Sequence, residues 1–163
     1  MTKVLFITAN PNDVHHSVGM ATGQAFIEEY RKNNETDDIT TLDLYHIEIP
    51  NMDTDAFSAM GKIRSGQPEA LTLVEQAKLS RIDELNEQFI SADKIVFVTP
   101  LWNLSSPAIV MEMGKRYLKQ MMAFFGITEF EELFIEGQFA SPDLAEEIKA
   151  DGIKRAIQLG QTF

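Results

Sequence analysis

Residues 89–104 read F-I-S-A-D-K-I-V-F-V-T-P-L-W-N-L, and this stretch decides the fold class. Its centre, 95–98, is a continuous run of β-branched and aromatic residues, which is typical of a strand covered on both faces of a parallel sheet. Ligands of such sheets bind beyond the carboxyl ends of the strands. The chain's only tryptophan, Trp102, follows there with the amide of Asn103. This pair is suited to line a planar heterocycle, although position alone slightly favours the alternative, in which the tryptophan simply covers the end of the sheet.

The rest of the chain alternates between strand and helix patterns. Residues 4–7 predict a second buried strand, 133–135 a shorter one, and 39–44, which alternate more, a strand at the sheet edge. Apolar residues at helical spacing predict helices over about 20–30, 55–60, 71–90 and 107–125, and from 141 onward. Ser17 and Ser141 are suitable N-caps, and Gly126 is a suitable C-cap. The pattern predicts one α/β domain, 1–163, with a parallel sheet.

The loop between the first strand and the first helix is the other candidate ligand site. Residues 9–19 match neither a dinucleotide-binding glycine motif nor a P-loop, and they contain no Lys or Arg. A phosphate there would depend on backbone N–H groups, the Ser17 hydroxyl and the positive helix N-terminus. The alternative is that Ser17 only caps the helix. His15 and His16 are adjacent in a polar loop without a third ligand nearby, which favours exposed side chains over a metal site.

Composition excludes several classes of function. The formal net charge of −11 and the absence of long basic clusters argue against nucleic acid as a partner. No apolar stretch is long enough to span a membrane, and no cysteine is present to form a disulfide or a thiolate site. We therefore expect a cytoplasmic protein. Neither a Ser-His-Asp arrangement nor a paired-carboxylate site is visible, so the sequence predicts no catalytic side chain and no metal site.

Several segments together resemble the FMN-dependent NADH-azoreductases, which are also NADH:quinone oxidoreductases. The similarity runs through the first strand K-V-L-F-I, the helix segment A-F-I-E-E-Y and T-L-D-L-Y at 41–45. It continues in the quoted stretch 89–104, S-P-A at 106–108, F-F-G-I-T at 124–128, I-E-G at 135–137 and P-D-L-A-E-E-I at 142–148. The block P-L-W-N-L at 100–104 is its most specific part. The resemblance implies a flavodoxin-like, three-layer α/β/α fold and a homodimer with FMN near the interface.

The resemblance also implies which residues would bind FMN. The loop after the first strand would hold the flavin phosphate through Asn10, Ser17, Val18 and Gly19, although Gly19 stands where a second serine is common in the family. The ribityl chain and the isoalloxazine ring would lie along a second set of residues, namely Pro100, Leu101, Trp102, Asn103 and Leu104.

One departure from the family is larger than any substitution. In the family, a loop, a central strand and a glycine-rich turn follow S-P-A, whereas here Ala108 runs directly into a segment that resembles the later helix. A βα unit of roughly 30 residues or more is therefore missing. Loss of a central strand would expose ladder groups and apolar faces. We hypothesise that the sequence joins two parts of a longer chain near Ala108 and Ile109, which an intact mass of 18.4 kDa would contradict.

The activity implied by the resemblance is a ping-pong cycle. NADH or NADPH would transfer a hydride to FMN, and the reduced flavin would pass two electrons to a quinone or an azo compound. Two alternatives remain open at this point. One is a flavodoxin-like electron carrier without a substrate pocket, and the other is a non-catalytic binding module that has lost FMN.

Overall fold

The computed structural model describes residues 1–100, 119–120, 122–124, 126–137 and 142–163. These residues fall into two units, one formed by Met1–Asn12 and Arg31–Val98, the other by Asp13–Tyr30 and Thr99–Phe163. Across the described ranges, no helix is both long enough and apolar enough to cross a membrane.

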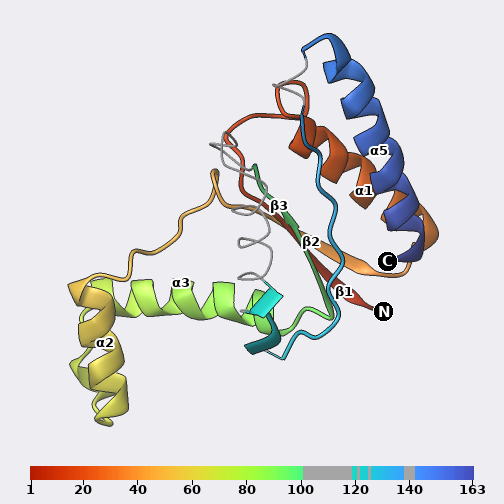
Figure 1. The fold of residues 1–163 in the computed structure, drawn as a ribbon. Coiled ribbons are helices and arrows are strands. Elements are labelled where there is room, and N and C mark those ends of the chain that lie inside the picture. The colour runs from red at the N-terminus through yellow and green to blue at the C-terminus, as the bar shows by residue number, and fades with distance from the viewer. Residues whose placement is uncertain (101–118, 121, 125, 138–141) are drawn as a thin grey trace. The chain divides into compact units, whose positions relative to one another are not determined.

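The first unit contains a parallel sheet of three strands in the order β2-β1-β3. Strand β1 (Lys3–Thr8) lies between β2 (Asp38–Asp43) and β3 (Lys94–Val98), as Figure 1 shows. The apolar residues of β1 are almost fully buried, whereas β2 is partly exposed. The structure thus confirms the strands predicted at 4–7 and 95–98, and the edge position of 39–44. The expected burial of 95–98 on both faces is wrong, because β3 is only half-buried and Phe97 is 50% exposed.

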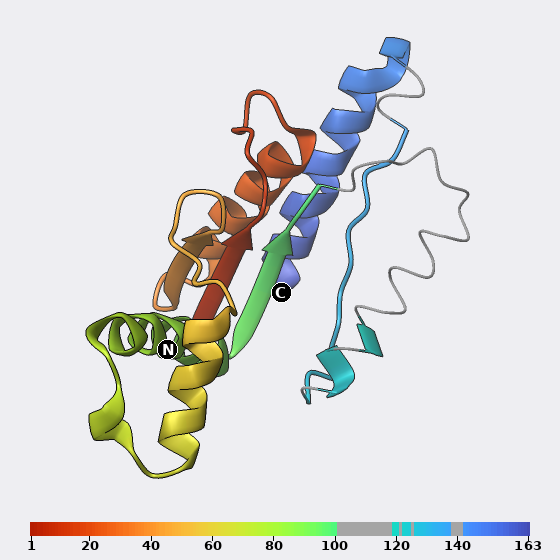
Figure 2. The ribbon, with the colours of Figure 1, turned by 90° about the vertical axis from the view of Figure 1, so that its left-hand side faces the viewer.

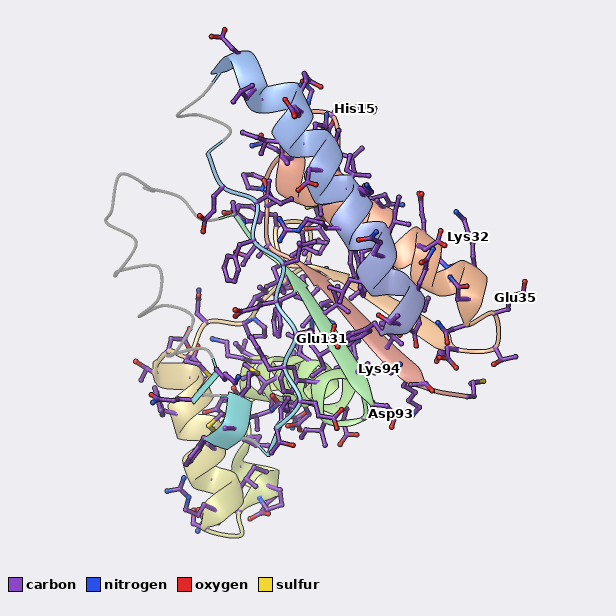
Figure 3. All side chains as sticks on the ribbon, turned by 45° about the vertical axis from the view of Figure 1, so that its right-hand side comes forward. His15, Lys32, Glu35, Asp93, Lys94 and Glu131 are labelled. Atoms are coloured by element: carbon purple, nitrogen blue, oxygen red, sulfur yellow. The ribbon has the colours of Figure 1, made fainter. Side chains whose placement is uncertain are left out.

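Hydrogen bonds fix both ends of this sheet. At the amino end, Lys3 and Asp93 exchange two bonds, one from the Lys3 N–H to Asp93 Oδ2 and one from the Asp93 N–H to the Lys3 carbonyl, each 2.8 Å long. Figure 3 labels Asp93 at this end, just before β3 begins at Lys94. At the carboxyl end, the Leu44 N–H donates to Thr8 O and the Ala9 N–H donates to Val98 O, both at 2.9 Å. The chain therefore leaves β1 for the next loop from a fixed position.

The same unit contains a pair of packed helices, α2 (Thr54–Arg64) and α3 (Leu73–Ile90), joined through a short 3₁₀ turn, η1 (Pro68–Ala70). Asp53 caps α2 by accepting a hydrogen bond from the Ala56 N–H, and the chain turns away at Gly66, where φ is 71°. Helix α2 is therefore longer than the predicted 55–60. Helix α3 begins after Thr72, which forms a capping box with Glu75.

A buried ion pair holds these two helices together. Glu75 is 5% exposed, and both of its carboxylate oxygens accept hydrogen bonds from Lys62 Nζ, at 2.9 and 2.8 Å. The Ser58 hydroxyl and the Thr72 N–H donate to the same carboxylate, each at 2.7 Å. The Lys62 bond and these two donors together lower the pKa of Glu75 to about 2. The carboxylate is thus fully ionised and fully bonded, as a buried charge requires.

In the second unit, α1 (Val18–Asn33) and α5 (Ala145–Thr162) lie side by side, as Figures 1 and 2 agree. Their contact depends on a glycine, since a Cβ at Gly160 would lie 2.6 Å from the backbone oxygen of Phe26. Next to it, Phe163 packs edge-on against Phe26 and Tyr30, with ring centroids 5.4 and 6.1 Å apart. The two helices can therefore pack closely because Gly160 has no side chain and because the three aromatic rings fill the space beside it.

The strand predicted at 133–135 is wrong. Residues 128–137 have no regular secondary structure, and Ile135 instead packs against α5, with its Cδ1 at 2.5 Å from where a Cβ of Gly152 would stand. A strand needs a neighbour to accept and donate its ladder hydrogen bonds. Within the described ranges, β1, β2 and β3 pair only among themselves.

Two helix ends were predicted with different success. Gly126, with φ of 85°, closes a Schellman motif in which its N–H donates to Ala123 O and the Ile127 N–H donates to Met122 O. This confirms the C-cap, while most of the helix predicted at 107–125 and the seam at 108–109 lie outside the described residues. The predicted start of the last helix differs from the structure. Pro142–Leu144 forms a 3₁₀ turn (η2), so α5 begins only at Ala145. Ser141 also lies outside the described residues.

Candidate functional site

The loop after β1 starts from buried polar residues at the carboxyl end of that strand. Asn10, 4% exposed, accepts a 2.9 Å hydrogen bond from the Asn12 N–H at its Oδ1, an Asx-turn that bends the chain. Thr8, two residues earlier, is 3% exposed. The sequence analysis identified Asn10 but missed Thr8, because nothing in a strand pattern shows whether a terminal threonine is buried.

Asp13 organises the next part of the loop, within the second unit. One of its oxygens, Oδ1, accepts from the N–H groups of His15 and His16, both at 3.0 Å, and pairs with His16 Nδ1 at 2.7 Å. The hydrogen bond from His16 is the largest cause of the lowered pKa of Asp13. Both histidines are exposed, as predicted, and Figure 3 shows His15 at the outer surface before α1. The backbone N–H groups of both histidines therefore help to shape the loop.

Ser17 is the N-cap of α1. Its Oγ accepts a 3.2 Å hydrogen bond from the Met20 N–H, and its carbonyl accepts from the Ala21 N–H at 3.0 Å. The helix makes no use of the N–H groups of Val18 and Gly19, as is general for the first turn. At Gly19 a Cβ would meet only the Ser17 Oγ, at 3.7 Å, so no side chain covers these donors from that position. Two backbone donors, one hydroxyl and a positive helix end together suit an anion such as a phosphate.

The second predicted segment is described only at its beginning. Pro100 is half-buried just after β3, whereas Leu101, Trp102, Asn103 and Leu104 lie outside the described residues. Their predicted role along a flavin ring stays a prediction.

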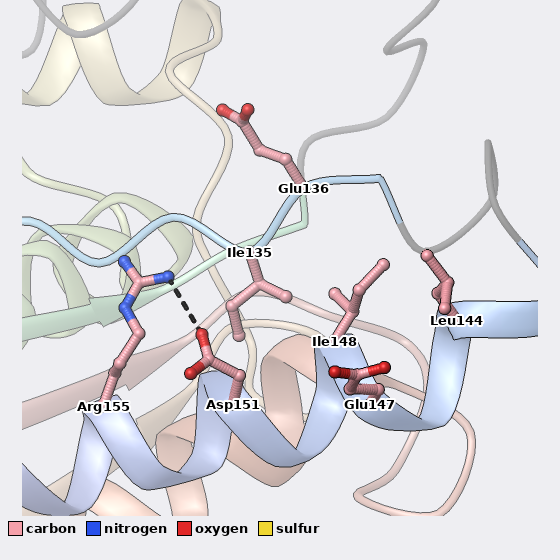
Figure 4. Close-up of a pocket in the computed structure, with 7 residues that line it drawn as sticks. All are labelled: Ile135, Glu136, Leu144, Glu147, Ile148, Asp151 and Arg155. Atoms are coloured by element: carbon pink, nitrogen blue, oxygen red, sulfur yellow. Dashed lines mark ion pairs between the residues drawn. The ribbon is translucent and has the colours of Figure 1, made fainter.

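Two pockets elsewhere in the described ranges contain none of the predicted site residues. The first, of about 320 Å³, lies between α5 and the segment before it (Figure 4). Three carboxylates line it beside a single Arg155, which lies 3.7 Å from Asp151, so it would repel a phosphate. The second, of about 400 Å³, lies between α2 and α3. The lining residues are Ile135, Glu136, Leu144, Glu147, Ile148, Asp151 and Arg155 in the first, and Met60, Ile63, Arg64, Leu79, Ile82, Asp83 and Asn86 in the second.

Comparison with known proteins now defines the class. Residues 2–112 match the family model for the flavodoxin-like fold, in agreement with the parallel sheet and the loop at its carboxyl end. An azoreductase from Bacillus anthracis strain Sterne superposes with a TM-score of 0.82 at 28% identity, over 100% of both chains. A second B. anthracis structure, an FMN-dependent NADH-azoreductase in complex with FMN, gives 0.78 at 22% identity over 98% of this chain and 100% of that one, a likeness of fold alone. The fold is that of a flavodoxin-like protein.

Sequence relatives narrow this class to one family. FMN-dependent NADH:quinone oxidoreductase 2 of Bacillus licheniformis is 43% identical over 211 residues, with 100% of both chains covered. The FMN-dependent NADH:quinone oxidoreductase of Geobacillus kaustophilus is also 43% identical over 211 residues at the same coverage. The chain belongs to this family of FMN-dependent NADH:quinone oxidoreductases and azoreductases.

These alignments also bear on the missing βα unit. They run over 211 positions but contain all 163 residues of this chain, so at least 48 positions have no counterpart in it. A total difference of that size agrees with the expected absence of a βα unit.

Proposed function

We propose that this chain binds FMN and transfers electrons from NADH or NADPH to quinones and azo compounds, with donor and acceptor reacting in turn in a ping-pong cycle. The observation that carries the proposal is the first turn of α1. There, Val18 and Gly19 carry backbone N–H groups that a helix leaves unbonded in its first turn, next to the N-cap Ser17, and Gly19 has no side chain. The similarity to FMN-dependent NADH:quinone oxidoreductases over the full chain supports the same conclusion.

The residues present fit the phosphate of FMN by their chemistry. Val18 and Gly19 would donate their backbone N–H groups, and Ser17 would add its hydroxyl. Asn10 would keep the loop in its bent form through the bond to Asn12. Because the loop has no Lys or Arg, hydrogen-bond donors and the helix N-terminus would supply all of the attraction.

FMN, when bound, supplies the chemistry of accepting a hydride and giving up two electrons. The protein then has to bind and orient the flavin and to exclude water around it. Pro100, Leu101, Trp102, Asn103 and Leu104 would shape the site along the ribityl chain and the ring system. No side chain is required as a covalent catalyst, in keeping with the absence of an acid–base pair in the sequence.

We also infer that the protein is a homodimer and that it is located in the cytoplasm. Several large apolar side chains on the α2–α3 pair are exposed, among them Phe57 at 62% and Leu73 at 83%. Burial against a second copy would stabilise such surfaces. Light scattering after size-exclusion chromatography would test the inference, and a monomer at micromolar concentration would refute it.

The test of the function is an absorbance spectrum recorded before and after addition of FMN, then NADH, then a quinone. We expect a flavin band that NADH bleaches and the quinone restores. A band that NADH leaves unchanged would favour the electron carrier.

A binding module that has lost FMN is a second candidate, for two reasons. Gly19 stands where a second serine is common in the family, so the loop has one hydroxyl fewer, and at least 48 positions of the alignment with the relatives have no counterpart in this chain. A colourless protein that does not bind added FMN would establish it and overturn the oxidoreductase proposal.

A further inference from the structure

The turn before α1 contains a carboxylate close to the proposed phosphate site. The backbone carbonyl of Asp13 accepts from the N–H groups of His16 and Ser17, at 3.3 and 3.0 Å, so Asp13 lies one turn before the N-cap of α1. Its side chain caps this turn through the N–H groups of His15 and His16. A negative charge at this point repels a second anion at the start of the same helix. The phosphate of FMN is such an anion.

His16 is the side chain that can compensate this charge. Its Nδ1 lies 2.7 Å from Asp13 Oδ1, and its side chain is 75% exposed, so the ring exchanges protons freely with solvent. Histidine is the residue whose charge ordinarily changes between pH 5 and 8. The hydrogen bond from His16 is the largest cause of the lowered pKa of Asp13, so the carboxylate stays ionised over that range. The net charge of the pair therefore depends on the ring alone.

The other charged groups near this turn come from α5 and from the turn itself. Helix α5 runs in the same direction as α1 (Figure 1), and Gln161 Nε2 donates to Glu29 Oε1 at 3.0 Å. Both helices rise equally per residue, so the first turn of α5 lies level with residues 13–17. The charged groups to consider are Glu146, Glu147 and Lys149 of α5, and His15. Of these, His15 is the one that also changes charge between pH 5 and 8 as a residue type.

We propose that protonation of His16, held in place by Asp13, tightens the binding of FMN through its phosphate. This inference rests on the proposed function, and it adds a residue that the family resemblance does not assign to the site. The protonated ring supplies the positive side chain that residues 9–19 otherwise lack, since they contain no Lys or Arg. The neutral ring leaves the charge of Asp13 uncompensated. The gain in affinity is therefore present at low pH and is lost as the pH rises.

The test compares the wild type with His16→Gln in the full chain, by titration of FMN followed by its fluorescence at pH 8 and at pH 5.5. Glutamine keeps a hydrogen-bond donor for Asp13 but cannot take up a proton. A phosphate monoester itself gains a proton at about pH 6, which affects both proteins equally. The ratio of the two Kd values, variant over wild type, therefore isolates the ring. We expect this ratio to rise roughly five- to tenfold from pH 8 to pH 5.5.

His46 provides a matched control. Its Nδ1 pairs with Asp43 Oδ2 at 2.9 Å at the same spacing of three residues, in the loop after β2, which contains none of the predicted FMN residues. The ratio for His46→Gln should stay constant with pH. Riboflavin, which lacks the phosphate, serves as the second probe, and its ratio for His16→Gln should stay constant as well.

A second measurement needs no variant. The chain has three histidines, and NMR follows the protonation of each ring in the wild type with and without FMN. Binding that favours the charged ring must, by linkage, move the titration of His16 to higher pH. The titration of His46 should stay in place.

Several outcomes would overturn this inference while FMN binding itself remains. They are a constant ratio for His16→Gln, an equal change of that ratio for riboflavin, a His16 titration that FMN does not move, or a pH dependence that only His15→Gln removes. A wild type that binds no FMN at either pH would overturn the proposed function, and the role of His16 with it.

Discussion

The contact between α1 and α5 predicts the effect of adding a single methyl group at Gly160. In Gly160→Ala, the new Cβ would lie 2.6 Å from Phe26 O and 3.3 Å from the Tyr30 backbone nitrogen. Backbone atoms cannot rotate out of the way as a side chain can. The two helices would therefore have to separate by about 0.8 Å to reach the 3.4 Å of ordinary contact.

The cost follows from this separation. A gap of that size forfeits roughly a quarter to a half of the dispersion energy between facing atoms, and overpacked sites typically lose about 1–3 kcal/mol. The edge-on contacts of Phe163 with Phe26 and Tyr30 would loosen as well. Alanine recovers at most about 1 kcal/mol of helix propensity. We expect a net loss of about 1–2 kcal/mol, which lowers the Tm by roughly 2–8 °C in a domain of this size.

Gly61→Ala is the matched control. Gly61 lies within α2, and a Cβ there would meet nothing within 4 Å. Only the helix propensity then changes, so this variant should gain about 0.5–1 kcal/mol. Thermal unfolding followed by circular dichroism at 222 nm measures both variants. The reasoning is refuted if Gly160→Ala matches or exceeds the wild-type Tm, or if both variants shift in the same direction.

Three further changes give distinct outcomes. Gly19→Ser, whose Cβ meets only a 3.7 Å contact, should tighten FMN binding roughly three- to tenfold by adding a hydroxyl, measured by FMN fluorescence; weaker binding would contradict this. Glu75 has a pKa lowered to about 2 from 4.5, so its stabilising effect is complete above pH 4.5 and is lost as the pH falls toward 2. Urea unfolding should show Glu75→Gln much less stable than wild type at pH 7 and nearly equal to it at low pH, whereas a constant difference would refute the assignment. Gly152→Ala should cost about 1 kcal/mol or less because it displaces only the flexible side chain of Ile135, and adding Ile135→Ala should remove the penalty of the new methyl group.

The sequence was sufficient to predict those elements whose signal is local. The apolar runs of β1 and β3 and the more polar run of β2 determined the three strands and the edge position of β2. Ser17 and Gly126 were correct as caps because a cap depends on a few neighbouring residues. The length of helix α2 was underestimated, since Asp53 was not recognised as its N-cap.

The strand at 133–135 could not be judged from its own residues. An apolar run becomes a strand only where a neighbour is present to complete its hydrogen bonds, and within the described ranges β1, β2 and β3 pair only among themselves. The close approach at Gly160 was also invisible, because its partner lies in a helix far away in the sequence.

The candidate site was predicted in part. The exposure of His15 and His16 and the N-cap at Ser17 followed from residue type and position, and the structure shows both. Asn10 was named only through the family resemblance, and its role toward a flavin phosphate stays a prediction. The burial of Thr8 was missed, because only the folded chain shows it.

The packing of α1 against α5 also affects how the protein is made. About 115 residues separate Tyr30 from the first residue of α5. A ribosome needs on the order of ten seconds to add that many. For that time the apolar face of α1 lacks its partner helix, so the nascent chain must stay soluble with Phe26 and Tyr30 unprotected. The wait for α5 during synthesis is therefore a constraint on this helix pair that the stability of the finished fold does not reveal.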